Sequence, residues 1–173
     1  KVDIGDKTEV EAVLHIERNP ERPAGQPLKL DGENLKLLAI HLDDKPLTDA
    51  DFEIHAGGLN IPDVPDRCRL TTRVEIDPDN NTALEGLYRS GDILCTQCEA
   101  EGFRHITYYL DRPDVMASFR TTISANASRY PVLLSNGNPV AEGLDGNRLW
   151  ITWDDPHPKP CYLFALVAGD LAC

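Results

Sequence analysis

Long apolar runs and a surplus of positive charge are both missing from this sequence. No stretch approaches the roughly 18 consecutive apolar residues of a membrane-spanning helix, and the opening KVDIGDKTEV shows no apolar core of a signal peptide. We therefore expect no membrane partner. The chain has 17 Lys and Arg residues against 29 Asp and Glu residues, a net charge of −12. Because a phosphate-binding surface needs clustered Lys and Arg, this balance also argues against a nucleic-acid partner.

The short motifs that usually mark a catalytic or nucleotide-binding site are missing as well. The sequence contains no HExxH, GxSxG, GxxxxGK[S/T] or GxGxxG. The histidines stand at positions 15, 41, 55, 105 and 157 and have no second histidine two or four residues away. Each is therefore interpreted as a surface or strand residue, and the sequence predicts no catalytic residue and no metal ligand in this chain.

The cysteines leave several interpretations open. Five is an odd number for a chain of 173 residues, which is large enough to need no disulfide staples. Cys95 and Cys98 have the spacing of half a zinc site or of a redox pair, but no second CxxC or HxxxH follows to complete four ligands. A nucleophilic pair of Cys98 with His105 is a further alternative, although nothing in the sequence activates the thiol. We expect reduced, partly buried thiols and a cytoplasmic location.

Turn-forming residues are plentiful and indicate a β protein. Thirteen prolines and twelve glycines are spread along the chain, which favours many turns over long helices. Short strands at intervals of roughly 8 to 12 residues, with turn signals between them, are typical of a β-sandwich or a barrel-like saddle. The sequence thus predicts a single β domain over residues 1–173. Both ends lie in strand-like patterns, so we expect a piece of a longer protein.

Apolar alternation and short apolar runs place the individual strands. We expect strands over residues 8–18, 35–42, 52–55, 59–61, 68–76, 103–110, 119–125, 132–134, 149–153 and 162–168. The strand over 103–110 would place Tyr108 and Tyr109 on opposite faces. Between strands, we expect a turn-rich connection over 19–27, a helical turn over 111–115 capped by Asp111, a hairpin turn at Asn136-Gly137 and an extended loop over 154–160. The run over 162–168 is expected to be buried on both sides or docked on a partner.

Unusual side chains concentrate between residues 95 and 119, where cysteines, acids, a histidine and paired tyrosines crowd together. The combination suggests a strand with flanking loops that reach a working surface. On the residues alone, the best candidate site is the polar cluster of Gln97, Glu99 and Glu101. The alternative is that these three are ordinary exposed loop residues.

Several segments resemble a known family. TALEGLY, CTQCEAEGFR, YYLDRPDV, LLSNGN and PKPCYLFALVAGD occur in order at the spacings of that family, and the resemblance extends more weakly over residues 8–80. The chain resembles the N-terminal domain of bacterial aminopeptidase N, the zinc-dependent alanyl aminopeptidase of the gluzincin class. The resemblance implies an all-β, saddle-like and mostly antiparallel β-sandwich packed beside a thermolysin-like catalytic domain. That domain, with its HExxH and GAMEN motifs, would follow Cys173.

The same resemblance implies which residues meet a substrate. In the family a TQxE segment projects into the active-site cleft, and it corresponds here to the segment from Thr96 to Glu99. Gln97 would line the pocket for the first side chain, and Glu99 would bind the free α-amine of a peptide. The parent enzyme would carry zinc in its catalytic domain and remove N-terminal amino acids, including Ala, Arg and Lys, from peptides. This chain would bind no metal, hold no catalytic residue and be inactive alone.

A function of another class stays open beside this one. The chain could be a stand-alone β-sandwich binding or interaction module without peptidase activity. It would then dock a partner through an exposed apolar strand near its C-terminus.

Overall fold

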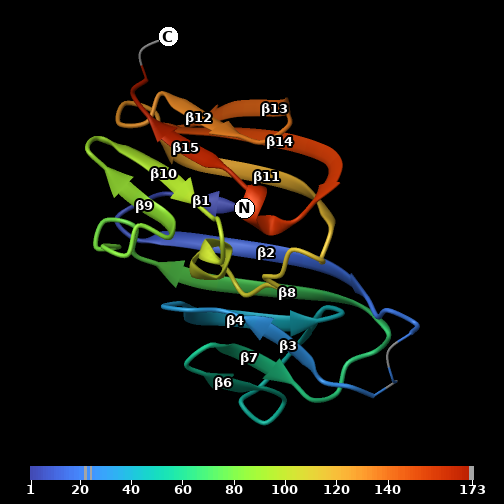
Figure 1. Cartoon of the computed structure of the whole chain (residues 1–173). Helices are drawn as coiled ribbons and strands as arrows, with labels where there is room; N and C mark the ends of the chain where they lie inside the picture. Colours follow the sequence, from blue (N-terminus) through green and yellow to red (C-terminus); the bar gives the residue numbers. More distant parts are fainter. Residues whose placement is uncertain (22, 24, 172–173) are drawn as a thin grey trace.

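A large, mostly antiparallel sheet is the base of the fold (Figure 1). The computed structural model describes residues 1–21, 23 and 25–171. Eight strands form the sheet in the order β13-β14-β11-β1-β2-β8-β4-β5. They are β1 (Val2–Asp3), β2 (Thr8–Glu17), β4 (Lys36–Leu42), β5 (Lys45–Pro46), β8 (Arg67–Ile76), β11 (Ala117–Asn126), β13 (Asn138–Asp145) and β14 (Arg148–Lys159). Only β1 and β11 pair in parallel among these described strands.

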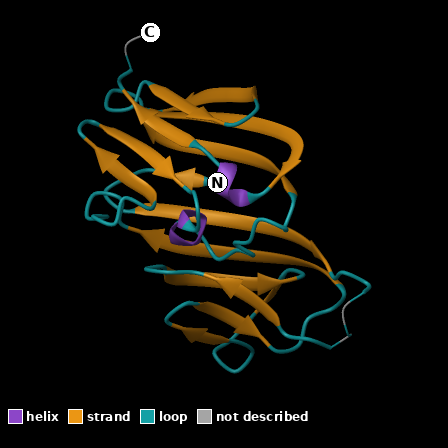
Figure 2. Cartoon of the chain, in the orientation of Figure 1, coloured by secondary structure: helices purple, strands orange, loops and turns teal. Residues whose placement is uncertain are grey.

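Two smaller sheets gather toward opposite ends of the large one. One has the order β12-β15-β10-β9 and the other the order β3-β7-β6. Their strands are β3 (Leu28–Asp31), β6 (Glu53–His55), β7 (Gly58–Ile61), β9 (Gly86–Ser90), β10 (Ile93–Gln97), β12 (Val132–Ser135) and β15 (Leu166–Gly169), and two short 3-10 helices are η1 (Gly102–His105) and η2 (Cys161–Leu163). Figure 2 shows how little of the chain is helical. The described residues contain no helix with the length and apolar character needed to cross a membrane.

Burial in the long strands follows the alternation of the sequence. Along β8 every second residue from Cys68 to Ile76 is buried, and along β2 the even-numbered residues from Thr8 to Ile16 are the less exposed ones. Each of these strands therefore turns one face to the core. The predicted mostly antiparallel β-sandwich is confirmed, as are the strands predicted over residues 8–18, 35–42, 52–55, 59–61, 68–76 and 119–125, with small shifts at their ends. In the predicted connection over 19–27, residues 22 and 24 lie outside the described residues, as does Cys173 near the C-terminus.

The strand predicted over residues 103–110 is wrong. The chain forms η1 there, followed by an irregular segment that pairs through a single bridge between Asp31 and Tyr109. Tyr109 and the tyrosine before it are both buried. Arg104 donates hydrogen bonds from its backbone N–H and its guanidinium to the carboxylate of Asp111, which folds the segment back on itself. Tertiary contacts thus override the strand preference of the aromatic residues.

The hairpin predicted at Asn136-Gly137 is wrong as well. β12 pairs with β15 and β13 pairs with β14, so these two residues carry the chain from one sheet into another. The Asn136 side chain donates to the carbonyl of Leu163 at 3.0 Å and accepts the N–H of Ala165 at 2.7 Å. Gly137 has the positive φ, 87°, that such a turn requires. The turn chemistry is present, but its side-chain bonds tie it to the connection before β15.

β14 runs through the proline-rich segment, where the sequence predicts a loop over 154–160. The strand continues to Lys159 beside β11. β13 stops pairing at Asp154, and the ladder between β11 and β14 is irregular beyond Asp155. The prolines of the segment therefore occupy positions where no regular ladder N–H is lost.

Two further predictions, for residues 162–168 and 111–115, need correction. The apolar run over 162–168 is not one strand, because its first part belongs to η2 and only Leu166 onward forms β15. β15 lies between β12 and β10 and is largely buried, so it is not an exposed docking strand. The helical turn predicted over 111–115 is a simple turn, closed by the N–H of Val115 and the carbonyl of Arg112 at 3.2 Å. Asp111 binds Arg104 and caps no helix.

Candidate functional site

The candidate site begins where the β9–β10 hairpin ends. β10 is an interior strand, paired with β9 on one side and β15 on the other. Its last residue, Gln97, lies opposite Gly86, the first residue of β9. The chain then leaves the sheet, and four residues later it enters η1. We call residues 97–105 the site loop.

Side chains alternate between solvent and core at the start of the site loop. Gln97 and Glu99 are exposed, whereas Cys98 between them is 3% exposed. The side-chain amide of Gln97 donates a hydrogen bond to the backbone carbonyl of Glu99 at 3.1 Å. The peptide bond between Glu99 and Ala100 is cis. The structure therefore brings Gln97 and Glu99 together, with Cys98 as their anchor in the core.

A close backbone approach fixes the far end of the loop. The N–H of Gly102 donates to the carbonyl of Cys98 at 2.9 Å. A Cβ atom on Gly102 would lie 2.3 Å from the carbonyl oxygen of Gln97 and 2.9 Å from the backbone nitrogen of Gly86. Only glycine fits this contact without movement of the backbone, so the loop is held against the start of β9.

A buried ion pair between Arg104 and Asp111 supports the loop from its core side. Arg104 donates to one carboxylate oxygen of Asp111 from its backbone N–H at 3.1 Å and from Nε at 3.0 Å. The thiol of Cys161 donates to the other oxygen at 2.9 Å, and the N–H of Asp111 donates to Asp31 at 3.0 Å. Burial, the largest single effect, acts to lower the pKa of Arg104, but the hydrogen bond and charge of Asp111 together with the charges of Asp31 and Glu101 outweigh it, so the pKa is raised. Both carboxylate oxygens of Asp111 thus accept hydrogen bonds inside the domain.

The acidic side chains around the loop differ in their partners. Glu101 lies 3.2 Å from the guanidinium of Arg104, and Glu85 lies 3.3 Å from Nε2 of His105. The carboxylate of Glu99 has neither a hydrogen bond nor an ion pair with any residue that the structure describes. The loop therefore presents one carboxylate without a described partner to solvent, beside the amide of Gln97. This arrangement suits a cationic group with N–H donors.

The cysteine alternatives find no support in the geometry. The described residues contain no group of three His, Cys, Asp or Glu side chains that could hold a metal ion. Burial, with a smaller contribution from Asp111, raises the pKa of Cys98 to about 12. A thiol in this state is neither an activated nucleophile nor a good metal ligand. His105 faces Glu85, and Cys98, Cys95 and the other described cysteines are free.

The supporting pair of Arg104 and Asp111 is what the sequence analysis missed. Its members are seven residues apart, and Cys161 joins them from 50 residues further along the chain. To predict this arrangement from the sequence, one would have to know already that β15 lies beside β10. The one available signal is an acid two residues after the paired tyrosines, and its position before Pro113 favours a helix cap instead.

Comparison with known proteins places this geometry in a family. Residues 9–163 match the Peptidase M1 N-terminal domain. Aminopeptidase N of Escherichia coli (strain K12) is 58% identical over 165 residues, which are 95% of this chain and 18% of that protein. The chain therefore spans about a fifth of the length of the relatives it matches.

Solved structures agree with the sequence match. Legionella pneumophila aminopeptidase A, in complex with aspartic acid, superposes with a TM-score of 0.94 at 36% identity. The match covers 99% of this chain and 20% of the Legionella chain. A second structure is an M1 zinc metallopeptidase from Deinococcus radiodurans, an E323A mutant bound to a Tyr-Ser-Ala substrate. Its TM-score is 0.83 at 16% identity, and the match covers 99% of this chain and 41% of the Deinococcus chain, so it shows a similarity of fold. The chain belongs to the Peptidase M1 N-terminal domain family.

Proposed function

We propose that this chain is the N-terminal domain of a zinc-dependent aminopeptidase and that its site loop binds the N-terminus of the peptide substrate. In this proposal Glu99 receives the free α-amine, and Gln97 lines the pocket for the first side chain. The names of the relatives, aminopeptidase N in Escherichia coli and an M1 zinc metallopeptidase in Deinococcus radiodurans, support the reaction class. The cytoplasm is the proposed location, and the free described thiols agree with it.

The observation that carries the proposal is the unpartnered carboxylate of Glu99 on a fixed loop. An aminopeptidase must hold an α-ammonium at a set distance from the reacting bond, so that only the first peptide bond is cleaved. A charge-assisted hydrogen bond from the ammonium to a carboxylate contributes about 1.5–3 kcal/mol. A blocked N-terminus would leave this carboxylate unpaired and would therefore be rejected. Gln97 holds the backbone of Glu99 in place through its 3.1 Å hydrogen bond.

Zinc does not fit among the described residues of this chain, since no group of three possible ligands occurs there. We therefore place the metal and the catalytic residues in the remainder of the enzyme, which is the proposed partner of this domain. The proposed substrates are peptides with a free N-terminus, with a broad preference that includes Ala, Arg and Lys. The isolated chain contributes binding contacts alone and is expected to be inactive.

The test is Glu99→Gln in the full-length enzyme. Loss of a charge-assisted bond of this size should lower kcat/KM for an alanyl arylamide by about 10- to 150-fold. The fold of the domain should be unchanged, because the carboxylate of Glu99 supports no other described residue. Glu142→Gln, a matched change of an exposed glutamate on β13, should leave the kinetics unaltered.

Two results would contradict the proposal. Unchanged kinetics in Glu99→Gln would remove this residue from the substrate site. Turnover of the arylamide above background by the isolated chain, assayed with added zinc, would show that the catalytic groups lie within these residues after all.

A further inference from the structure

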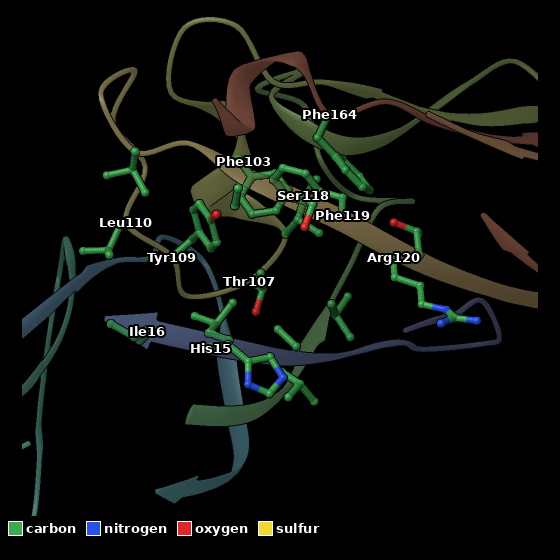
Figure 3. A pocket seen from close by; sticks show the side chains of 18 of the residues that line it. His15, Ile16, Phe103, Thr107, Tyr109, Leu110, Ser118, Phe119, Arg120 and Phe164 are labelled. Atoms are coloured by element: carbon green, nitrogen blue, oxygen red, sulfur yellow. The ribbon is translucent and has the colours of Figure 1, made fainter. Parts of the chain in front are cut away.

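Three consecutive side chains of η1 contact three different parts of the domain. Phe103 packs edge to face on Tyr109, with ring centroids 5.0 Å apart, and Figure 3 shows the two rings within the aromatic part of the core. Arg104 binds the carboxylate of Asp111. The third residue, His105, contacts the chain at the start of β9. Because η1 ends the site loop, these contacts together determine where the loop lies.

His105 lies between two carboxylates from different parts of the chain. Its side chain is 10% exposed, and Nε2 lies 3.3 Å from a carboxylate oxygen of Glu85 and 3.8 Å from one of Glu33. The other oxygen of Glu33 lies 3.9 Å from the guanidinium of Arg104, whereas Glu85 makes no other ion pair with a described residue. A carboxylate beside a buried imidazole accepts its N–H and fixes the orientation of the ring.

Glu85 directly precedes the residue that contacts both ends of the site loop. Gly86 pairs with Gln97 at the end of β10. It has a positive φ of 70°, and a Cβ atom there would lie 2.7 Å from the Cβ of His105 and 2.9 Å from the carbonyl oxygen of Gly102. The first and the last residue of the site loop therefore meet the same backbone. A shift at Gly86 would move both of them.

The segment that carries Glu85 is held in an uncommon conformation. Leu84 has a positive φ of 59°, which a leucine rarely adopts. The side-chain amide of Asn81 donates to the carbonyl of Glu85 at 2.7 Å and to that of Leu87 at 2.9 Å. A backbone of this kind persists only where the surrounding contacts determine it. The side chain of Glu85 is 55% exposed, but its backbone is thus fixed beside His105.

We propose that Glu85 and His105 are positioning residues for the substrate site, because their contact holds η1 against β9 and thereby sets the place of Glu99. This inference rests on the proposed function, in which Glu99 receives the α-amine of the peptide. The carboxylate of Glu99 has no described partner of its own, so the backbone of the site loop determines where it lies. That backbone meets β9 at Gly86. Neither positioning residue needs to touch the substrate.

The kinetic test is Glu85→Ala in the full-length enzyme, alone and combined with Glu99→Gln. Alone, it should lower kcat/KM for an alanyl arylamide about three- to tenfold, chiefly by raising KM, because a displaced carboxylate holds the α-amine less well. In the Glu99→Gln background its effect should be at most about twofold, because changes that act through the same group are not additive. Glu53→Ala, at an exposed glutamate of β6, is the matched control and should leave kcat/KM unaltered.

Two variants of His105 separate the contact from the mere filling of space. His105→Gln keeps an N–H donor near the position of Nε2 and should stay within about twofold of the wild-type kcat/KM. His105→Leu has a similar size but no donor, and it should behave like Glu85→Ala. If His105→Leu does not fold, Glu85→Ala decides, because its exposed side chain can be removed without loss of the fold.

Amide hydrogen exchange of the same enzymes reports the contact without any substrate. The N–H of Gly102, which donates to the carbonyl of Cys98, should exchange at least about threefold faster in Glu85→Ala, because the site loop then opens more often. Amides of β8 serve as the reference and should keep their rates. The control variant Glu53→Ala should leave the rate at Gly102 unaltered.

Several outcomes would overturn the inference. They are unchanged exchange at Gly102 in Glu85→Ala, equal kinetics of His105→Gln and His105→Leu, and an effect of Glu85→Ala that persists in full without the Glu99 carboxylate. Full activity of Glu85→Ala beside an impaired Glu99→Gln would overturn the positioning role and leave the proposed function standing. If Glu99→Gln itself has unaltered kinetics, the proposed function fails, and the positioning of a substrate group fails with it.

Discussion

Removal of the Asp111 carboxylate should destabilise the domain more than any surface change. Asp111 is 4% exposed, and its carboxylate accepts hydrogen bonds from two groups of Arg104 and from the thiol of Cys161. Asp111→Ala leaves the guanidinium, whose side chain is only 14% exposed, without its buried counter-ion. Breaking one partner of such a pair costs about 3–5 kcal/mol. Urea unfolding followed by tryptophan fluorescence measures this loss directly.

A matched surface pair gives the control for this prediction. Arg112 and Asp114 are in contact at 3.1 Å, but their side chains are 59% and 71% exposed. Asp114→Ala should therefore change the unfolding free energy by no more than about 0.5 kcal/mol. If Asp111→Ala cost no more than Asp114→Ala, the reasoning that burial makes this pair indispensable would be refuted. Asp111→Asn, which keeps the shape and loses the charge, should fall between the two.

Three further changes test other parts of the structure. Gly102→Ala should cost about 1–3 kcal/mol by urea unfolding, because its Cβ would lie 2.3 Å from a backbone carbonyl oxygen; a neutral result would mean that the loop can shift freely. Cys98, with its pKa raised to about 12 by burial, should resist alkylation at pH 8 until the domain unfolds, whereas the half-buried Cys95 should react before Cys98 does; mass spectrometry of the labelled peptides distinguishes the order of these two. The hydrogen bond from Lys7 lowers the pKa of Glu75 below its ordinary 4.5, so this pair stabilises the fold above that pH and ceases to do so as the pH falls through the lowered value. Glu75→Gln should consequently lower Tm at pH 7 and have less effect at pH 3, and an equal effect at both would contradict the pairing.

The fold could be predicted where one strand's own alternation decides its structure. β8 buries every second residue and β2 alternates between less and more exposed residues, and this period is visible in the sequence. The prediction failed where distant contacts decide. Asn136 lies in a sequence typical of hairpins, yet its side chain binds the connection before β15, 27 and 29 residues away. The paired tyrosines have strong strand propensity, but the Arg104–Asp111 bond folds that segment out of the sheet.

The candidate site was less accessible to residue-level reasoning than the fold. From composition and spacing, Gln97 and Glu99 were no more distinctive than Glu101, and the resemblance to a family singled them out. The structure adds a physical difference, because Glu101 forms an ion pair with Arg104, whereas the carboxylate of Glu99 has no described partner. That distinction depends on where η1 turns the chain, and no local pattern encodes it. The roles of Gln97 and Glu99 in substrate binding stay predictions.

The short β1 strand has a consequence for the order in which the domain can be assembled during synthesis. Every strand on the β2 side of the large sheet, through β8, β4 and β5, comes from the first 76 residues. That half can therefore close its ladders while the rest of the polypeptide is still being made. β11, β14 and β13 come later and join through β1, with the N–H of Ile4 donating to Ser124 at 2.8 Å. The large sheet is thus made of two halves from separate parts of the sequence, and the pairing of β1 with β11 joins them once β11 has been synthesised.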